Sequence, residues 1–535
     1  MDFLRQIQDL LETVLFTALI CCMMIIPWKH ALHMFQQNRY ETGRYFRWAR
    51  EQLRDWKSWL FFIVVSVLCL AVLPVPGYQA GKICAVWLAV ALGLFSLWRD
   101  KKRKVIKPLQ LTSRVKRQIA VMLVLNLLWL IPAAIFSDYP LWLLWIWLAS
   151  WINWALIPVM AWLTEPFENL IKKHYMKLAR NILKKHDRLI RIGITGSYGK
   201  TSSKNILHEI LSEKFYSLPT PASFNTPMGI TITIRQQLKP THEVFICEMG
   251  ADHVGDITQL MDFVKPQIGI VTSIGPQHLN TFGSMENIIH EKMQMIEKLP
   301  VTGFGVLNRD NEFIRDYYLR SACRLAWVGI DREDVDYRAV NIVFSPQGSR
   351  FDIRTADGRE VPFQTRLLGR HNISNILAAV AVGRDLGVSW EQLQRAVAQV
   401  RYVEHRLEMK KINGYTFIDD AFNSNPSGSA MALEVLKMMP GTRIIVTPGM
   451  IDLGERQHQI NREFGKKMKG CADRVILVGK RQTAPILEGL KESGFDLAQV
   501  ETVASVQEAF ALIYRQATVQ DTILLENDLP DAFSH

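Results

Sequence analysis

The chain has 535 residues, enough for several domains, and 49% of them are apolar. Its formal net charge is +12, but the positive excess lies in residues 1–188, and the remainder carries slightly more acidic than basic side chains. A strongly basic surface for nucleic acid is therefore excluded from the larger part of the chain. The seven cysteines show no paired spacing, which excludes a disulfide framework and a cysteine metal cluster.

Five apolar stretches predict an α-helical membrane domain over residues 1–165. Each stretch is close to the ~20 residues that a helix needs to cross a bilayer. Basic residues gather in the loops after the first and the third stretch, which places the N-terminus outside and everything after the last stretch in the cytoplasm. The expected location is therefore a membrane that the chain crosses several times. The five stretches are 10–27, 59–76, 80–98, 118–136 and 141–163.

Residues 166–188 predict a basic amphipathic helix that links the membrane domain to the rest of the chain. Apolar side chains such as Leu170 and Leu178 form a stripe, and basic ones such as Lys172 and Lys184 lie beside it. A helix of this kind can lie on anionic lipid headgroups. Packing of the helix on its own domain explains the same pattern equally well. Membrane lipids and this domain are therefore the two partners considered for the helix.

A phosphate-binding loop is expected next, where a short apolar strand starting at Ile190 runs into a glycine-rich turn. Glycines such as Gly196 and Gly199 let successive backbone N–H groups point at a phosphate, and the dipole of the following helix adds positive potential. Lys200 is expected to reach the β- and γ-phosphates, and the hydroxyl of Thr201 to coordinate Mg²⁺. Binding of a nucleoside triphosphate is the stronger hypothesis, and a glycine-rich turn that binds nothing is the weaker one.

Apolar strands and helices alternate after this loop, which predicts a doubly wound parallel sheet in a central α/β domain over 189–402. A new series of strands begins near residue 415, so a second, Rossmann-like α/β domain is expected over 403–535. Glu248 and His278 each follow a strand of the central domain, and open α/β sheets bind ligands at strand ends. A carboxylate there suits Mg²⁺, whereas a histidine alone is more often a surface residue.

Nine short motifs, taken in order, resemble those of the Mur ligases, the ATP-dependent amide-bond ligases that build the peptidoglycan peptide. The resemblance covers residues 189 to about 490 and is strongest to the branch that adds D-alanyl-D-alanine to the tripeptide precursor. Residues 1–165 show no resemblance to this family. The motifs lie at 193–201, 223–225, 248–250, 278–279, 307–310, 369–375, 405–408, 419–426 and 449–455.

The resemblance implies roles for individual residues, with ATP and Mg²⁺ as cofactors. Lys292 falls where the family carries a carbamylated lysine, an anion able to bind a second Mg²⁺; a plain salt bridge is the alternative. The implied catalytic residues are Lys200, His278, Lys292 and Asn225. The implied ATP site comprises Gly196, Gly199, Lys200, Thr201, Ser202, Asn308, Asn372, Asn375, Arg406 and Asp420. The implied metal ligands are Thr201, Glu248, His278 and Lys292.

Two further positions bear on the resemblance. His458 is a candidate for contact with a substrate. Asn280 stands where the family usually has an acidic residue, two positions after the histidine.

The resemblance implies an ATP-dependent acid–amino-acid ligase that works through an acyl phosphate in cell-wall precursor synthesis, at the cytoplasmic face of a bacterial membrane. Its partners would be a lipid-linked or nucleotide-linked peptide acceptor and an amino acid or dipeptide. The lipid-linked acceptor is favoured because the predicted membrane domain stands where the family has a nucleotide-sugar-binding domain. A ligase for a capsule polymer of γ-linked amino acids, a membrane transport ATPase and a degenerate ligase acting as a scaffold are the alternatives.

Overall fold

The computed structural model describes five main stretches of the chain and divides into two compact units, Met1–Lys173 and His174–His535. The described residues are 28–53, 108–135, 139–421, 426–451 and 456–527, with residue 453 and scattered positions between 63 and 101.

In the part of the first unit that the structure describes, helices are joined by polar contacts. Its helices include α2 (Thr42–Leu53), α5 (Ser113–Ile135) and the beginning of α6 (Tyr139–Lys185). The guanidinium of Arg117 on α5 donates two hydrogen bonds, of 2.7 and 2.8 Å, to the carboxylate of Glu168 on α6. Such bidentate pairs fix the relative orientation of the two side chains, so they set the register between α5 and α6.

The predicted five-span membrane domain over 1–165 is wrong for the part of the chain that the structure describes. None of the helices found there is both long and apolar enough to cross a bilayer. The expected spans over 118–136 and 141–163 fall in α5 and α6, where Asn126 and Asn153 interrupt the apolar runs and are buried. The predicted multi-pass membrane location is wrong for the same reason. Three other expected spans, 10–27, 59–76 and 80–98, lie almost wholly outside the described residues.

The predicted linker helix over 166–188 is the second half of α6, a continuous helix that contains Pro158 and Pro166. In the second unit, Met176, Ala179 and Leu183 of this helix are buried in one apolar cluster with strand and helix residues of the central domain. Leu178, which the sequence placed in the apolar stripe, is 38% exposed. The helix therefore packs on its own domain, which was the second of the two roles considered for it.

The central domain is built on a nine-stranded sheet in the order β2-β3-β1-β4-β5-β6-β7-β8-β9. The strands from β2 to β7 are parallel, as predicted, whereas β8 and β9 add an antiparallel extension that the sequence did not predict. The strands are β1 (Ile190–Thr195), β2 (Ser217–Pro219), β3 (Val244–Glu248), β4 (Ile268–Val271), β5 (Phe304–Asn308), β6 (Arg324–Gly329), β7 (Tyr337–Ser345), β8 (Gly348–Thr355) and β9 (Glu360–Thr365).

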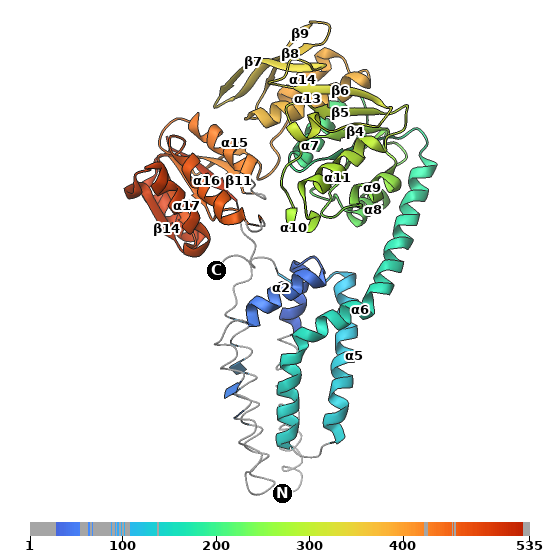
Figure 1. Ribbon diagram of the computed structural model, residues 1–535, viewed down its shortest axis with the longest axis vertical. Helices are drawn as coiled ribbons and strands as arrows, with labels where there is room; N and C mark the ends of the chain where they lie inside the picture. The colour runs from blue at the N-terminus through green and yellow to red at the C-terminus, as the bar shows by residue number, and fades with distance from the viewer. Residues whose placement is uncertain are drawn as a thin grey trace. The chain divides into compact units, whose positions relative to one another are not determined.

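Helices cover both faces of this sheet (Figure 1). Val244 and Ile246 of β3 pack in the apolar cluster that contains α7, α13 and α14, whereas Phe245 and Cys247 pack in the cluster that contains α8, α9 and α11. This alternation is the period of two that a strand buried on both faces requires. The helices are α7 (Lys200–Leu211), α8 (Pro227–Gln236), α9 (Asp256–Val264), α10 (Leu279–Phe282), α11 (Met285–Glu297), α12 (Glu312–Arg315), α13 (Arg370–Asp385) and α14 (Trp390–Gln399).

The C-terminal domain has its own six-stranded sheet in the order β10-β11-β15-β12-β13-β14, parallel except for β10. It confirms the expected second α/β domain. Its strands are β10 (Glu408–Ile412), β11 (Tyr415–Asp420), β12 (Arg443–Thr447), β13 (Arg474–Val478), β14 (Val500–Val503) and β15 (Thr522–Glu526). Its helices are α15 (Pro426–Lys437), α16 (Gln457–Met468), α17 (Lys480–Ser493) and α18 (Val506–Gln516).

Candidate functional site

The glycine-rich turn between β1 and α7 is shaped by the end of the neighbouring strand β4. Gly196 has a φ of +150°, and a Cβ at this position would collide with the hydroxyl of Thr272, which follows β4. Gly199 has a φ of +82° and precedes α7 without a side chain that caps it. The first N–H groups of α7 therefore remain directed at the turn, where an anion such as phosphate is favoured by both hydrogen bonding and the helix dipole.

Lys200, the first residue of α7, lies across this turn. Its ammonium donates hydrogen bonds to the carbonyl oxygens of Gly196 at 2.7 Å and Ser197 at 3.1 Å. Burial lowers the pKa of Lys200 to about 8, while the nearby charge of Glu248 acts in the opposite direction. Thr201 and Ser202 are buried in the same first turn of α7. The predicted phosphate-binding residues are thus gathered on one turn and the start of one helix.

Glu248 ends β3 and is placed beside the turn by the strand pairing, because Ile194 of β1 pairs with it. Its carboxylate is held from two sides. The Asn225 amide donates to Oε1 at 3.0 Å, and the Lys204 ammonium lies 3.1 Å from Oε2. The sequence singled out Asn225 and Glu248 but missed Lys204, whose position one turn after Lys200 on α7 was the available signal.

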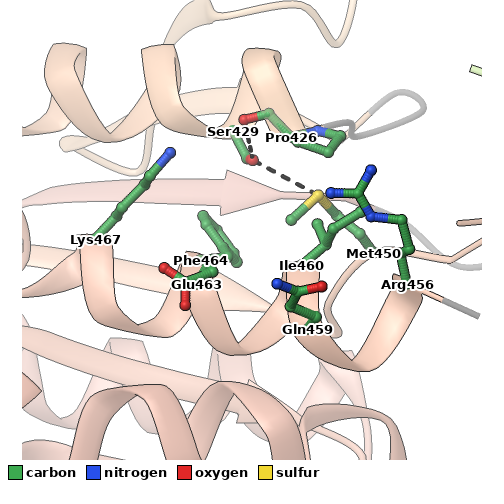
Figure 2. A pocket seen from close by; sticks show the side chains of 9 residues that line it. All are labelled: Pro426, Ser429, Met450, Arg456, Gln459, Ile460, Glu463, Phe464 and Lys467. Atoms are coloured by element: carbon green, nitrogen blue, oxygen red, sulfur yellow. Dashed lines mark hydrogen bonds between the residues drawn. The ribbon is translucent and has the colours of Figure 1, made fainter. Parts of the chain in front are cut away.

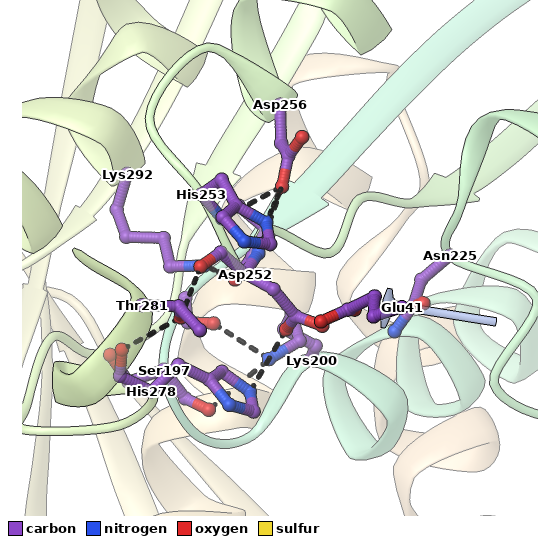
Figure 3. A network of polar contacts seen from close by, with 12 residues as sticks. Glu41, Ser197, Lys200, Asn225, Asp252, His253, Asp256, His278, Thr281 and Lys292 are labelled. Atoms are coloured by element: carbon purple, nitrogen blue, oxygen red, sulfur yellow. Dashed lines mark hydrogen bonds and ion pairs between the residues drawn. The ribbon is translucent and has the colours of Figure 1, made fainter. Parts of the chain in front are cut away.

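His278 and Lys292 lie around a second carboxylate, Asp252, which sequence reasoning also missed (Figure 3). The Nε2 atom of His278 is 3.2 Å from Oδ1 of Asp252. Lys292 of α11 is buried and donates to the carbonyl oxygen of Ala251 at 3.2 Å. Burial lowers the pKa of Lys292 to about 7, the charge of Lys200 lowers it further, and Asp252 raises it. Asp252 therefore supplies negative charge near Lys200, His278 and Lys292, three residues that are predicted to be catalytic.

The loop that carries Asp252 is fixed by two other acidic residues. Glu291 of α11 is buried and accepts hydrogen bonds from the backbone of Gly255 at 2.7 Å and of Ile257 at 2.5 Å. Asp256 accepts from the backbone N–H groups of Asp252 and His253, both at 2.9 Å. These bonds hold the loop in one conformation, so the position of Asp252 does not depend on its own side-chain contacts alone.

Asn308, Asn372 and Asn375, assigned to the adenine pocket by the resemblance, use their amides mainly within the protein. Asn308 donates to the carbonyl oxygen of Thr272 at 3.2 Å, and Asn372 donates to that of Leu368 at 2.8 Å. Asn375 lies against Gly199 and accepts a hydrogen bond of 2.9 Å from Ser203. The structure thus brings Asn375 to the phosphate loop, and its contact with adenine stays a prediction.

Arg406 and Asp420 lie where the central domain passes into the C-terminal domain. Burial is the main cause that lowers the pKa of Lys200, and the positive charge of Arg406 lowers it further. Asp420 ends β11 and accepts a hydrogen bond of 3.1 Å from the backbone of Leu407. Burial raises the pKa of Asp420 to about 6. His458 is 63% exposed on α16 and pairs with Glu488 at 3.5 Å, so no described contact brings it to Lys200.

A small hollow of about 130 Å³ lies elsewhere in the C-terminal domain, between α15, α16 and the end of β12 (Figure 2). Met450, Ile460 and Phe464 give it an apolar wall, with Arg456 and Glu463 also lining it. No predicted site residue lines this hollow.

Few side chains of this site are suited to bind a Mg²⁺ ion. Within the described ranges, no group of three or more His, Cys, Asp or Glu side chains is arranged to hold a metal ion. Mg²⁺ usually binds through one or two carboxylates together with substrate phosphates. Glu248 with the Thr201 hydroxyl, next to a phosphate-binding turn, fits that mode. The site is therefore suited to a metal that arrives with a nucleotide.

Comparison with protein families matches two segments of the chain. Residues 194–383 match the Mur ligase middle domain, and residues 405–526 match the Mur ligase, glutamate ligase domain.

Individual relatives share the name UDP-N-acetylmuramoyl-tripeptide–D-alanyl-D-alanine ligase. The protein from Escherichia coli (strain K12) is 30% identical over 296 residues, covering 55% of this chain and 65% of the relative, less than two thirds of its length. The protein from Mycobacterium tuberculosis (strain CDC 1551 / Oshkosh) is 32% identical over 357 residues, covering 63% and 69%.

Solved structures with a similar fold include two MurF proteins. MurF from Acinetobacter baumannii superposes with a TM-score of 0.60 at 26% identity, covering 68% of this chain and 78% of that one. MurF from Thermotoga maritima in complex with ADP has the same fold, with a TM-score of 0.60 at 23% identity over 67% and 80% of the two chains.

Asp252 provides a test of the site that is independent of the reaction. The Asp252→Asn substitution removes the charge that faces His278 and keeps the shape of the side chain. If His278 has its predicted role as a metal ligand, we expect the affinity for Mg²⁺ in the presence of a nucleotide to fall about 10- to 100-fold, the usual effect of removing a partner that orients such a ligand. Calorimetric titration measures it. Asp262→Asn, at a 64% exposed position on α9, is the matched control; equal affinities of the two variants would contradict a role for Asp252.

Proposed function

Because the chain belongs to the Mur ligase family, we propose that it is an ATP-dependent ligase that joins a carboxylate to an amine through an acyl phosphate. One observation carries the proposal: the phosphate-binding turn, Lys200, Glu248, His278 and Lys292 converge at one edge of the central sheet. The carboxylate of the acceptor attacks the γ-phosphorus of ATP, the bond from that phosphorus to the ADP oxygen breaks, and an acyl phosphate and ADP are formed. The amine then displaces phosphate and forms the amide bond.

The side chains of this site act on the charge that develops during phosphoryl transfer. Lys200 and the N–H groups at the start of α7 stabilise negative charge on the phosphoryl oxygens. Thr201, Glu248, His278 and a carbamylated Lys292 would hold Mg²⁺, which neutralises phosphate charge when it is bound. Arg406, whose charge acts on Lys200 after the larger effect of burial, adds positive charge near the phosphate-binding turn.

The acceptor that we propose is a nucleotide-linked peptide, with a D-alanyl-D-alanine dipeptide as the amine. The names of the relatives support this choice, since they describe a UDP-N-acetylmuramoyl-tripeptide and D-alanyl-D-alanine. The lipid-linked acceptor favoured from the sequence rested on five membrane spans, and the described helices include none. A transport ATPase loses its basis for the same reason, and no observation favours a capsule-polymer ligase.

The direct experiment incubates the purified protein with ATP, Mg²⁺, D-alanyl-D-alanine and a tripeptide acceptor, and identifies the products by mass. We expect amide formation with the nucleotide-linked acceptor, accompanied by one ADP per product. The same peptide carried on a polyprenyl lipid is the second arm. Faster turnover of the lipid-linked form would contradict the proposed acceptor, and absence of any amide product would contradict the proposed activity.

Lys200→Ala tests the phosphate-binding turn. We expect a complete loss of ATP-dependent amide formation with little change in the thermal unfolding midpoint, because the hydrogen bonds that the described residues give the Lys200 ammonium are to carbonyl oxygens of the turn and not to another element of the core. Lys239→Ala, at an exposed position in the same domain, is the matched control and should keep full activity. Activity retained by Lys200→Ala would mean that the phosphate-binding turn has been misassigned.

Substitutions of Lys292 test whether this residue acts as a carbamate, which is an anion, or as an unmodified lysine, which is a cation. We expect both Lys292→Ala and Lys292→Arg to be inactive, because neither can become an anionic metal ligand. Short carboxylic acids should restore part of the activity of Lys292→Ala, since a carboxylate can take the place of the carbamate, and added bicarbonate should not. An active Lys292→Arg variant would instead support the salt-bridge alternative.

A further inference from the structure

Lys204 is a buried lysine that the proposed mechanism does not use. It lies on α7 one turn after Lys200, and its side chain is 1% exposed. Its ammonium makes two polar contacts: 3.1 Å to Oε2 of Glu248 and 2.5 Å to the carbonyl oxygen of Ala222. Both partners are far from Lys204 in sequence, so this one side chain connects a helix, the end of a strand and a loop.

An ion pair in this position is not explained by stability alone. Burying two charges costs desolvation energy that their attraction roughly offsets, so an apolar side chain of similar volume often serves the fold as well. Ile206 and Leu207 of the same helix already pack in the apolar core of the domain. The presence of a charged group at position 204 is therefore better explained by the two groups that it contacts than by the stability of the fold.

The first partner is the carboxylate of Glu248, whose two oxygens are in different surroundings. Oε2 is next to the Lys204 ammonium, whereas Oε1 accepts the amide of Asn225 at 3.0 Å. Each carboxylate oxygen has two lone pairs, so Oε1 can accept this hydrogen bond and still bind a cation. With Oε2 held by a fixed positive charge, Oε1 is the oxygen on which a divalent ion meets less repulsion.

The second partner, Ala222, lies in the segment 220–226 that carries Asn225. This segment is held closely: the backbone N–H of Glu248 donates to the Thr220 hydroxyl at 3.1 Å, and that of Gly250 donates to the Asn225 carbonyl oxygen at 2.9 Å. A Cβ at Gly250 would come within 2.8 Å of the Asn225 side chain. Lys204 adds a contact to the middle of the segment, and so fixes Asn225 and Glu248 relative to each other.

We propose that Lys204 is a positioning residue: it holds Oε2 of Glu248 and the 220–226 segment so that Oε1 faces the divalent ion bound with the nucleotide. This inference rests on the proposed role of Glu248 at the Mg²⁺ site. It assigns to Lys204 no contact with substrate. Its consequence is that removal of the ammonium changes the binding of the metal more than the binding of the nucleotide.

The test is a calorimetric titration of Mg²⁺ into protein that is saturated with a non-hydrolysable ATP analogue. We expect Lys204→Met to weaken the affinity for Mg²⁺ about 10- to 100-fold, as for other groups that orient metal ligands, and to leave the affinity for the metal-free analogue within about twofold. Lys298→Met is the matched control, because Lys298 is 34% exposed and lies 3.8 Å from Asp262 on the surface. An affinity for Mg²⁺ equal to that of the control would overturn the proposal.

Folding is checked separately, because Lys204→Met leaves the Glu248 charge buried without its cation. If the unfolding midpoint shows that Lys204→Met does not fold, the titration uses Lys204→Gln instead. Glutamine keeps a hydrogen-bond donor and loses the charge. A purely structural ion pair predicts that the folded fraction of either variant binds Mg²⁺ normally. Because the titration measures binding and not catalysis, it tests Lys204 even if the protein forms no amide.

Discussion

The parallel pairing of β1 with β3 and β4 is the constraint on which the site depends. Parallel strands end at the same edge of a sheet, so the turn after β1, the carboxylate at the end of β3 and the threonine after β4 meet there. The close approach of Thr272 to Gly196 follows from this pairing and leaves no room for a side chain at position 196. A shift of one residue in the register of β3 would place Glu248 on another face of the sheet, away from Lys200 and Lys204.

Charge burial is the second consequence of this arrangement. Lys204 and Glu248 are each 1% exposed, and removing one member of such a pair typically costs about 3–5 kcal/mol. That is a large part of the roughly 5–15 kcal/mol by which domains are stable, so the pair is tied to folding as well as to the site. The loop after β3 is secured differently, by backbone hydrogen bonds to Glu291 and Asp256. The polar groups of the site are thus held by the protein before any ligand binds.

Much of the α/β fold could be predicted from the sequence, because strands buried on both faces give continuous apolar runs and the glycine-rich turn has a distinctive spacing. The antiparallel β8 and β9 were missed, although the alternation of buried and exposed residues along β9 is typical of a strand with one exposed face. Lys204 and Asp252 were missed for another reason: their importance depends on partners 44 residues away for Lys204 and 26 residues away for Asp252. For the described part of residues 1–165, the membrane prediction was wrong because the buried Asn126 and Asn153 interrupt the apolar runs of α5 and α6, and none of the described helices is both long and apolar enough to cross a bilayer.

Transfer of oxygen from the acceptor to phosphate tests the central claim most directly. If the acceptor carboxylate attacks the γ-phosphate, one of its oxygens remains on the phosphate that the amine displaces. An acceptor labelled with ¹⁸O in its reacting carboxylate should therefore yield inorganic phosphate that carries one ¹⁸O atom for each amide bond formed, as measured by mass spectrometry. Phosphate without label, released together with amide product, would contradict an acyl phosphate and with it the role proposed for this site.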